Sequence, residues 1–144
     1  MSEVKRAVID TNVLVYDAFT DTVFHKEAAT TLETLDEWVI PSIVIHEFVW
    51  VLRELGLEPN IILEFVQQYL FHRKAKFVPE LKEQITAALE HVIAEQLSIS
   101  RYNDKVILTH ALKMNVPIAT FDRKLRNQAK KVGVRVLPIK IPKK

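Results

Sequence analysis

The sequence contains no cysteine and only two glycines among its 144 residues. Without cysteine, the chain has no disulfide scaffold, no thiolate zinc site and no thiol nucleophile. Gly56 and Gly133 are too few and too far apart to form a glycine-rich phosphate loop. No apolar run approaches the ~18 residues that cross a membrane. The N-terminal apolar stretch is too short for a signal peptide, so we expect a cytoplasmic protein with no membrane segment.

Hydrophobic residues make up 49% of the chain and charged residues 26%, which predicts a folded domain rather than a disordered chain. The net charge of +2 is unevenly distributed. Residues 1–122 carry a balance of −7, whereas residues 123–144 carry +9 and no acid. A basic end next to an acidic body can attract a polyanion beside a metal site, although a solvated helix face gives the same pattern. We expect one domain over residues 1–138 and a mobile basic tail over 139–144.

Short apolar runs alternate with longer helical periods, a pattern typical of an α/β fold with a parallel sheet. The predicted strands cover residues 7–9, 38–40, 76–78, 118–120 and 134–137. The predicted helices cover residues 22–37, 42–55, 60–71, 81–98, 103–114 and 123–131. Ser42 is expected to cap the second helix, and Gly56 to follow its end. Because helices 42–55 and 60–71 are so apolar, they belong either to the core or to a dimer interface.

Four acidic residues fall near the predicted ends of strands. Asp10 directly follows the first strand, and Asp122 lies just beyond the fourth. Glu47 lies in the second turn of one helix and Asp104 in the first turn of another. In a parallel sheet with right-handed crossovers, all four reach the same rim.

Asp10, Asp104 and Asp122 each have a structural explanation, as a helix cap or as a complement to the helix dipole, and Glu47 could instead pair with His46 or an arginine. Together, however, four ionised carboxylates at one rim would repel one another and raise each other's pKa values. A hard divalent cation removes that penalty, and oxygen ligands suit Mg²⁺ or Mn²⁺. We therefore expect one or two such ions at the rim.

Four short motifs occur in order along essentially the whole chain, each at a predicted strand or helix end. They are Asp10-Thr11-Asn12, Pro41-Ser42 followed by Glu47, Asn103-Asp104, and Thr120-Phe121-Asp122 followed by Arg123. Each motif alone is weak evidence for a family. All four in this order, at matching strand and helix positions, resemble the PIN domain family, and specifically the VapC-type toxins of prokaryotic toxin–antitoxin pairs.

The resemblance implies a three-layer α/β/α sandwich with a central parallel sheet of strand order 3-2-1-4-5. It implies a Mg²⁺- or Mn²⁺-dependent endoribonuclease that hydrolyses RNA phosphodiester bonds with a metal-activated water. Single-stranded or structured RNA would be the substrate. A homodimer and an antitoxin partner are also implied.

The resemblance further assigns roles to individual residues. The catalytic and metal-binding acids would be Asp10, Glu47, Asp104 and Asp122. The groups that orient these acids would be Thr11, Asn12 and Thr120. The cations flanking the acids, as candidate contacts to substrate phosphates, are Arg101, Lys105, Arg123 and Lys124. Lys105 departs from the family, which very often has alanine there, and its ammonium is expected in solvent, at the phosphates or in the acidic pocket.

Alternative functions make different demands on the sequence. A haloacid dehalogenase-type phosphatase needs a second aspartate two residues after Asp10, where Asn12 stands. A zinc hydrolase needs HxxxH or HExxH spacing, which the five histidines lack. A catalytically silent PIN-like module that binds RNA or protein, and a standalone RNA-processing nuclease, both stay open. His46 and Phe121 are expected to be packing residues.

Overall fold

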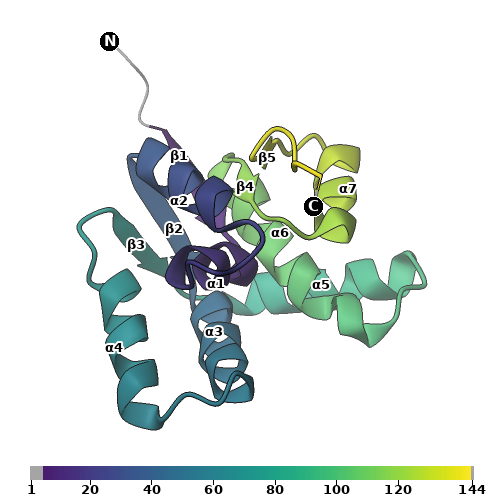
Figure 1. Cartoon of the computed structure of the whole chain (residues 1–144). Coiled ribbons are helices and arrows are strands. Elements are labelled where there is room, and N and C mark those ends of the chain that lie inside the picture. The colour runs from purple at the N-terminus through teal and green to yellow at the C-terminus, as the bar shows by residue number, and fades with distance from the viewer. Residues whose placement is uncertain (1–4, 144) are drawn as a thin grey trace.

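The computed structural model describes residues 5–143, which form a parallel five-stranded sheet of order β3-β2-β1-β4-β5 (Figure 1). The predicted α/β class and strand order are therefore confirmed. The strands are β1 (Arg6–Ile9), β2 (Glu37–Pro41), β3 (Ala75–Val78), β4 (Ile118–Ala119) and β5 (Val136–Leu137). The helices are α1 (Thr11–Ala18), α2 (His25–Thr34), α3 (Ser42–Glu54), α4 (Pro59–Leu70), α5 (Lys82–Ala94), α6 (Tyr102–Met114) and α7 (Arg123–Lys131), with a 3₁₀ turn at Ile99–Arg101.

Strands β1 and β2 occupy the middle of the sheet because their side chains are apolar on both faces. Ala7, Val8 and Ile9 are fully buried, as are Val39 and Ile40 in the neighbouring strand. Val8 pairs in parallel register with Val39 on one side and with Ile118 of β4 on the other. Such continuous apolar runs are typical of parallel strands covered on both faces.

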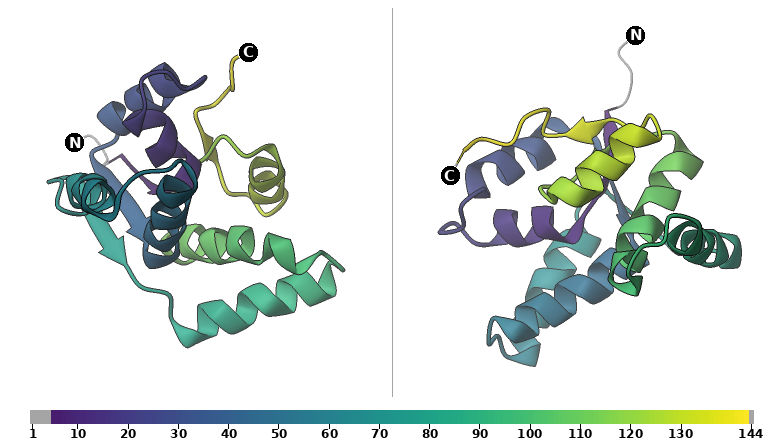
Figure 2. Two further views of the ribbon diagram at one scale, coloured as in Figure 1. Left: turned by 60° about the horizontal axis from the view of Figure 1, so that its bottom comes forward. Right: turned by 90° about the vertical axis from the view of Figure 1, so that its right-hand side faces the viewer.

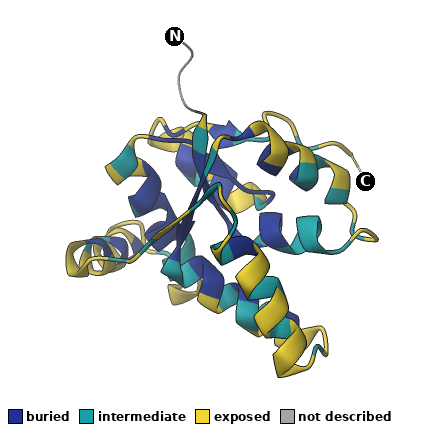
Figure 3. Ribbon diagram, turned by 90° about the vertical axis from the view of Figure 1, so that its left-hand side faces the viewer, coloured by how far each residue is buried: buried dark blue, intermediate teal, exposed yellow. Residues whose placement is uncertain are grey.

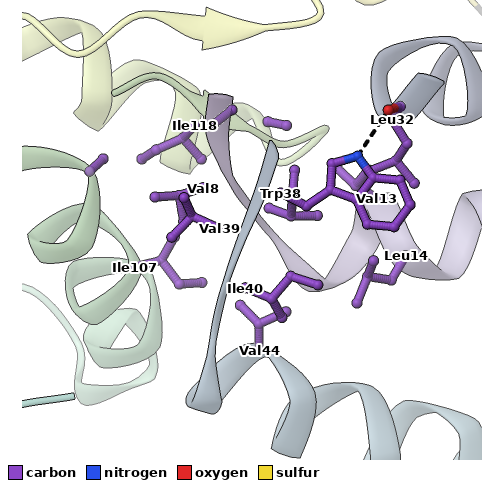
Figure 4. Close-up of a cluster of buried hydrophobic side chains, with 14 of the residues drawn as sticks. Val8, Val13, Leu14, Leu32, Trp38, Val39, Ile40, Val44, Ile107 and Ile118 are labelled. Atoms are coloured by element: carbon purple, nitrogen blue, oxygen red, sulfur yellow. Dashed lines mark hydrogen bonds between the residues drawn. The ribbon is translucent and has the colours of Figure 1, made fainter. Parts of the chain in front are cut away.

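Helices cover the two faces of the sheet and form the outer layers. Ile107 of α6 lies against Val39 on one face, whereas Leu14 of α1 lies on the opposite face (Figure 4). On that second face, Trp38 donates a hydrogen bond from Nε1 to the carbonyl of Leu32 in α2, at 2.9 Å. Buried residues gather in the sheet and on the helix sides that face it (Figure 3). The strand ends are therefore held by packing on both sides.

The N-terminal part of the first helical region departs from the sequence prediction. The structure has a helix at Thr11–Ala18, which the periodicity does not indicate, because eight residues with three β-branched members, Thr11, Val13 and Val15, give a weak helical signal. The helix predicted over 22–37 is shorter, at His25–Thr34, since Glu37 already belongs to β2. Helix α1 directly follows β1, so its N-terminus lies at the carboxyl end of the central strand.

The start of α3 is capped differently from the prediction. Ser42 is the first helical residue rather than the cap, and the residue before it, Pro41, makes no side-chain cap. The carboxylate of Glu80, in the loop after β3, accepts hydrogen bonds from Ser42 Oγ at 2.6 Å and from the Ile43 amide at 3.3 Å. Glu80 also accepts from Nε2 of buried His110, at 3.0 Å. A distant acid therefore fixes the end of the helix that carries Glu47.

Replacing Glu80 by alanine leaves the α3 terminus and His110 without their acceptor. Burial lowers the pKa of His110, and the neutral ring donates through Nε2 to Glu80 and accepts at Nδ1 from Gln84. We expect Glu80→Ala to lower the free energy of unfolding by ~2 kcal/mol in urea denaturation. Glu83→Ala, at an exposed position one turn away, is the control and should change it by less than ~0.5 kcal/mol. Equal effects of the two variants would contradict the capping role.

The C-terminal residues are tied to the fold rather than free. Ile141 packs against the hydrophobic core, and the carbonyls of Pro138 and Ile139 accept hydrogen bonds from Arg126 of α7. Within the described residues, Ile139 and Ile141 contact the fold, and the mobility of the segment 139–144 stays a prediction. The boundary at 138 stays a prediction.

Candidate active site at the carboxyl edge of the sheet

Asp10 lies where β1 ends and α1 begins, and it is buried. Its Oδ1 accepts from the Thr11 amide at 2.7 Å, so it caps α1. Its Oδ2 accepts from Thr120 Oγ1 at 2.7 Å and from Asn12 Nδ2 at 3.1 Å. These contacts fix both carboxylate oxygens, and they join the ends of β1 and β4.

Asn12 and Thr120 connect the two strand ends across 108 residues of sequence. Asn12 Nδ2 donates to Thr120 Oγ1 at 3.2 Å, and its Oδ1 accepts from the Phe121 amide at 3.0 Å. Thr120 Oγ1 in turn accepts from the Asp122 amide, also at 3.0 Å. Asn12 and Thr120, two of the three residues predicted to orient the acids, therefore lie in direct contact with Asp10 and with the backbone that leads to Asp122.

Glu47 extends from α3 toward the same edge and is half-buried. Its Oε1 accepts from Thr11 Oγ1, and its Oε2 accepts from Asn103 Nδ2, both at 2.9 Å. Neither donor carries a charge. His46, its neighbour, is exposed, so the packing role predicted for His46 is wrong.

Asp104 lies in the first turn of α6 and has a cationic partner. Arg101 donates to Asp104 Oδ2 from Nη2 at 2.8 Å and from Nε at 3.2 Å. Both side chains are largely covered, at 16% and 19% exposure. The pair holds Asp104 in place and partly balances its charge. Arg101, predicted as a phosphate contact, is therefore engaged with an acid.

Asp122 begins α7 as its cap. Its Oδ1 accepts from the amides of Lys124 and Leu125, at 2.8 and 3.2 Å. The structural explanation for this residue is thus correct. Capping also places the Asp122 carboxylate close enough to Asp104 for its charge to raise the pKa of Asp104.

The four acids influence one another electrostatically. Burial raises the pKa of Asp10 to about 7, against the hydrogen bonds from Thr120 and Thr11, and the charges of Glu47 and Asp104 raise it further. Burial also raises the pKa of Asp104. The hydrogen bond from Arg101 opposes this rise, and the charge of Asp122 adds to it. The structure therefore brings the four predicted acids to one edge, where burial and neighbouring charges disfavour the ionised forms of Asp10 and Asp104.

The donor chemistry at this edge fits a hard divalent cation. The acids offer carboxylate oxygens, the ligands that Mg²⁺ and Mn²⁺ prefer. Asp10 and Glu47 are held by amide and hydroxyl donors of no net charge, so their own charge stays available. Over residues 5–143, no three acidic or histidine side chains are already arranged as a metal-holding group.

The candidate phosphate contacts separate into two kinds. Arg123 and Lys124 are exposed in the first turn of α7, and the charge of Lys124 acts on Asp104. Lys105 is instead buried, with 3% exposure, and its ammonium donates to Glu95 beyond α5. We therefore correct the assignment of Lys105: its side chain serves the α5–α6 pair, because the long stem is buried and its charge is already matched.

Two polar groups at the site escaped the sequence prediction. Asn103 stood in the third motif but was given no role, although its amide holds Glu47. Glu80 has no motif around it, and only its contacts in space reveal it. Phe121 is buried and stacks on Phe24 with ring centres 5.0 Å apart, so its predicted packing role is confirmed.

Comparison with known families and structures agrees with this geometry. The sequence model of the PIN domain family matches residues 7–131. No curated protein sequence matches the chain.

Among solved structures, VapC20 of Mycobacterium tuberculosis, described as a toxin that cleaves the sarcin-ricin loop, aligns with a TM-score of 0.74 and 14% identity over 94% of this chain and 99% of its own. VapBC2 from Rickettsia felis aligns with a TM-score of 0.65 and 16% identity over 91% and 96%. A toxin–antitoxin complex from Klebsiella pneumoniae aligns with a TM-score of 0.63 and 17% identity over 94% and 99%. At these identities the likeness shows a shared fold.

Proposed function

The chain belongs to the PIN domain family, and on that premise we propose that it is a metal-dependent endoribonuclease, the toxin of a toxin–antitoxin pair. The observation that supports this most strongly is the arrangement of the four acids. They come from four segments of the chain and meet at the carboxyl edge of the sheet. Asp10 and Glu47 are oriented there by neutral donors rather than neutralised by basic ones.

The roles follow from the contacts. Asp10, Glu47 and Asp104 would hold one Mg²⁺ or Mn²⁺, with Asp122 as the fourth acid. When bound, such an ion lowers the pKa of a water and balances charge on the phosphate. One or two ions are compatible with four acids.

The chain's own residues orient these acids and bind the substrate. Thr120 and Asn12 hold Asp10, and Thr11 and Asn103 hold Glu47. The exposed cations at the start of α7 would bind RNA phosphates. A metal-activated water would attack phosphorus, so that no Ser, Cys or His nucleophile is required.

The partners and location complete the proposal. Over residues 5–143, no helix has the length and apolarity to span a membrane, and we place the protein in the cytoplasm. Solved structures with the same fold include complexes of toxin with antitoxin, and we propose an antitoxin partner here. Helices 42–55 and 60–71 would form a homodimer interface, since Trp50 is 61% exposed and Leu63 is 55% exposed. One PIN domain would span residues 1–138, with the basic tail at 139–144.

A cleavage assay tests the activity. Single-stranded RNA and DNA of the same sequence are incubated with the wild type and with Asp104→Asn, in Mn²⁺, Mg²⁺ or chelator. We expect RNA cleavage that requires metal and is lost in Asp104→Asn, because that variant removes one carboxylate ligand. Asp21→Asn, at an exposed position, is the matched control and should cleave like the wild type.

The same preparations distinguish the enzyme from a silent binding module. A metal present at ~100 times its Kd stabilises a folded protein by about 2.7 kcal/mol. The wild type should therefore melt at a higher temperature in Mn²⁺ than in chelator, and Asp104→Asn should show a smaller shift. Absence of both cleavage and a metal-induced shift would contradict the nuclease and favour the binding module.

A further inference from the structure

A pocket lies beside the acidic edge, between α7 and the C-terminal segment that follows β5. This segment passes alongside α7 (Figure 2). The pocket has a volume of about 350 Å³, in the lower range for small-ligand sites. It is lined by Arg123, Arg126, Asn127, Lys130, Ile139, Lys140 and Ile141.

The charge of this pocket is of one sign. Of the described residues that line it, four are Lys or Arg and none is acidic. The sequence around it, residues 123–144, carries nine basic residues and no acid. A concave surface whose charged residues are all cationic raises the local concentration of anions.

Arg126 makes the pocket more than a collection of surface lysines. Its side chain is buried, with 5% exposure. In the described part of the chain, its guanidinium donates to neutral carbonyls, those of Thr120 at 2.8 Å, Pro138 at 2.6 Å and Ile139 at 3.1 Å. Burial lowers its pKa, and the charge of Arg123 adds to that effect. A buried cation matched only by dipoles, with another cation beside it, is stabilised when an anion binds.

The pocket is connected directly to the candidate active site. Arg126 binds the carbonyl of Thr120, whose hydroxyl donates to Asp10 at 2.7 Å. Helix α7 begins at Asp122, so its first turn adjoins the acids. From Arg123 to Lys130 the helix rises by ~10 Å. An RNA strand bound at the acids would therefore also pass the basic residues that follow along α7.

We propose that this pocket binds a backbone phosphate of the RNA on one side of the bond to be cleaved. The inference rests on the proposed function for its choice of RNA. Lys130 and Lys140 contact the phosphate, with Arg123 between them and the acids. Arg126 is a positioning residue, which holds the C-terminal segment against α7 so that both walls of the pocket face each other.

The salt dependence of RNA binding tests this role. A fluorescein-labelled 12-nucleotide RNA is titrated with the full chain in chelator, and the Kd is measured by anisotropy from 50 to 300 mM KCl. Each phosphate neutralised on a single strand contributes ~0.7 to the slope of log K against log salt. We expect Lys130→Ala/Lys140→Ala to lower that slope by at least ~0.7 and to weaken binding about fivefold at ~100 mM salt.

The control removes two lysines elsewhere. Lys76 lies on edge strand β3, at the other side of the sheet from β5, and Lys113 lies near the end of α6; both are exposed. Lys76→Ala/Lys113→Ala should leave the slope unchanged within ~0.2, since neither residue lines the pocket. Lys130→Glu provides a second test variant on the exposed face of α7, and it should weaken binding further than alanine does.

The possible results separate this inference from the proposed nuclease. If the wild type cleaves RNA and the Lys130/Lys140 variant keeps the full slope, the pocket is not a phosphate site and the nuclease stands. If the wild type binds RNA with the lysine-dependent slope but shows neither cleavage nor a metal-induced shift in melting temperature, the pocket stands as a phosphate site and the nuclease does not. If the two double variants lose equal affinity, binding depends on overall charge and the pocket inference is overturned.

Discussion

Asp10→Asn is expected to abolish RNA cleavage while making the metal-free protein more stable at pH 8. The loss in kcat/KM should be at least ~10³-fold. Without the central carboxylate the metal binds poorly, and the several kcal/mol by which it would stabilise the transition state are lost. The gain arises because the asparagine removes a charge that burial and its neighbours, Glu47 and Asp104, disfavour. An acid with only a structural role would not lose activity and gain stability together on this substitution.

The direction in which stability changes with pH follows from the raised pKa of Asp10. The ordinary pKa of Asp10 is 3.8, and in the folded chain it is about 7. Between these values the folded state holds a proton that the unfolded chain releases, so stability is fully present below pH ~4 and falls until pH ~7. The three-unit difference sets an upper limit of ~4 kcal/mol.

The measurement is urea denaturation in chelator from pH 4 to pH 8. The difference between Asp10→Asn and wild type should grow with pH up to about 7 and then level off. Asp21→Asn, which is exposed, should follow the wild type throughout. Parallel pH profiles for Asp10→Asn and wild type would show that Asp10 is ionised at an ordinary pKa.

Phe48→Ala is expected to lower the free energy of unfolding by ~3–5 kcal/mol. Phe48 is fully buried on the inner side of α3 and meets Tyr69 of α4 edge-on, with ring centres 5.6 Å apart. Its removal leaves a cavity under the helix that carries Glu47, so cleavage should fall as well. Urea denaturation measures the first effect and the cleavage assay the second.

The comparison variant for Phe48 is Phe71→Ala. Phe71 lies just beyond α4 and is 81% exposed, so its loss should cost less than ~0.5 kcal/mol at low protein concentration. Phe48→Leu should cost less than Phe48→Ala, because it keeps most of the volume. A small loss for Phe48→Ala would mean that α3 is not held by this contact.

The sheet could be predicted from the sequence because its physical signals are local. Runs such as Val39-Ile40 next to Pro41 mark buried strands, and the alternation with helices requires parallel order. That order alone brings Asp10 and Asp122 to one edge, although their catalytic and metal-binding roles stay predictions. Helix α1 was missed because short helices depend on tertiary packing more than on their own periodicity.

The environments of the charged side chains could not be predicted in this way. Arg101 and Lys105 lie within five residues of each other and were assigned the same role. Arg101 turns to Asp104, three residues along the chain, whereas Lys105 turns to Glu95, a contact that depends on the packing of α5 on α6. The Glu80 cap is likewise invisible in sequence, since it lies 38 residues from Ser42.

The hydrogen bond between Asn12 and Thr120 has a consequence for the timing of synthesis. Residues near the two ends of the chain must both be present before Asp10 is held by its partners. A ribosome that has synthesised only the first hundred residues has made strands β1, β2 and β3 but not β4, which completes the acidic edge. On the proposed function, the acidic edge of the nuclease is complete only once β4 has been synthesised.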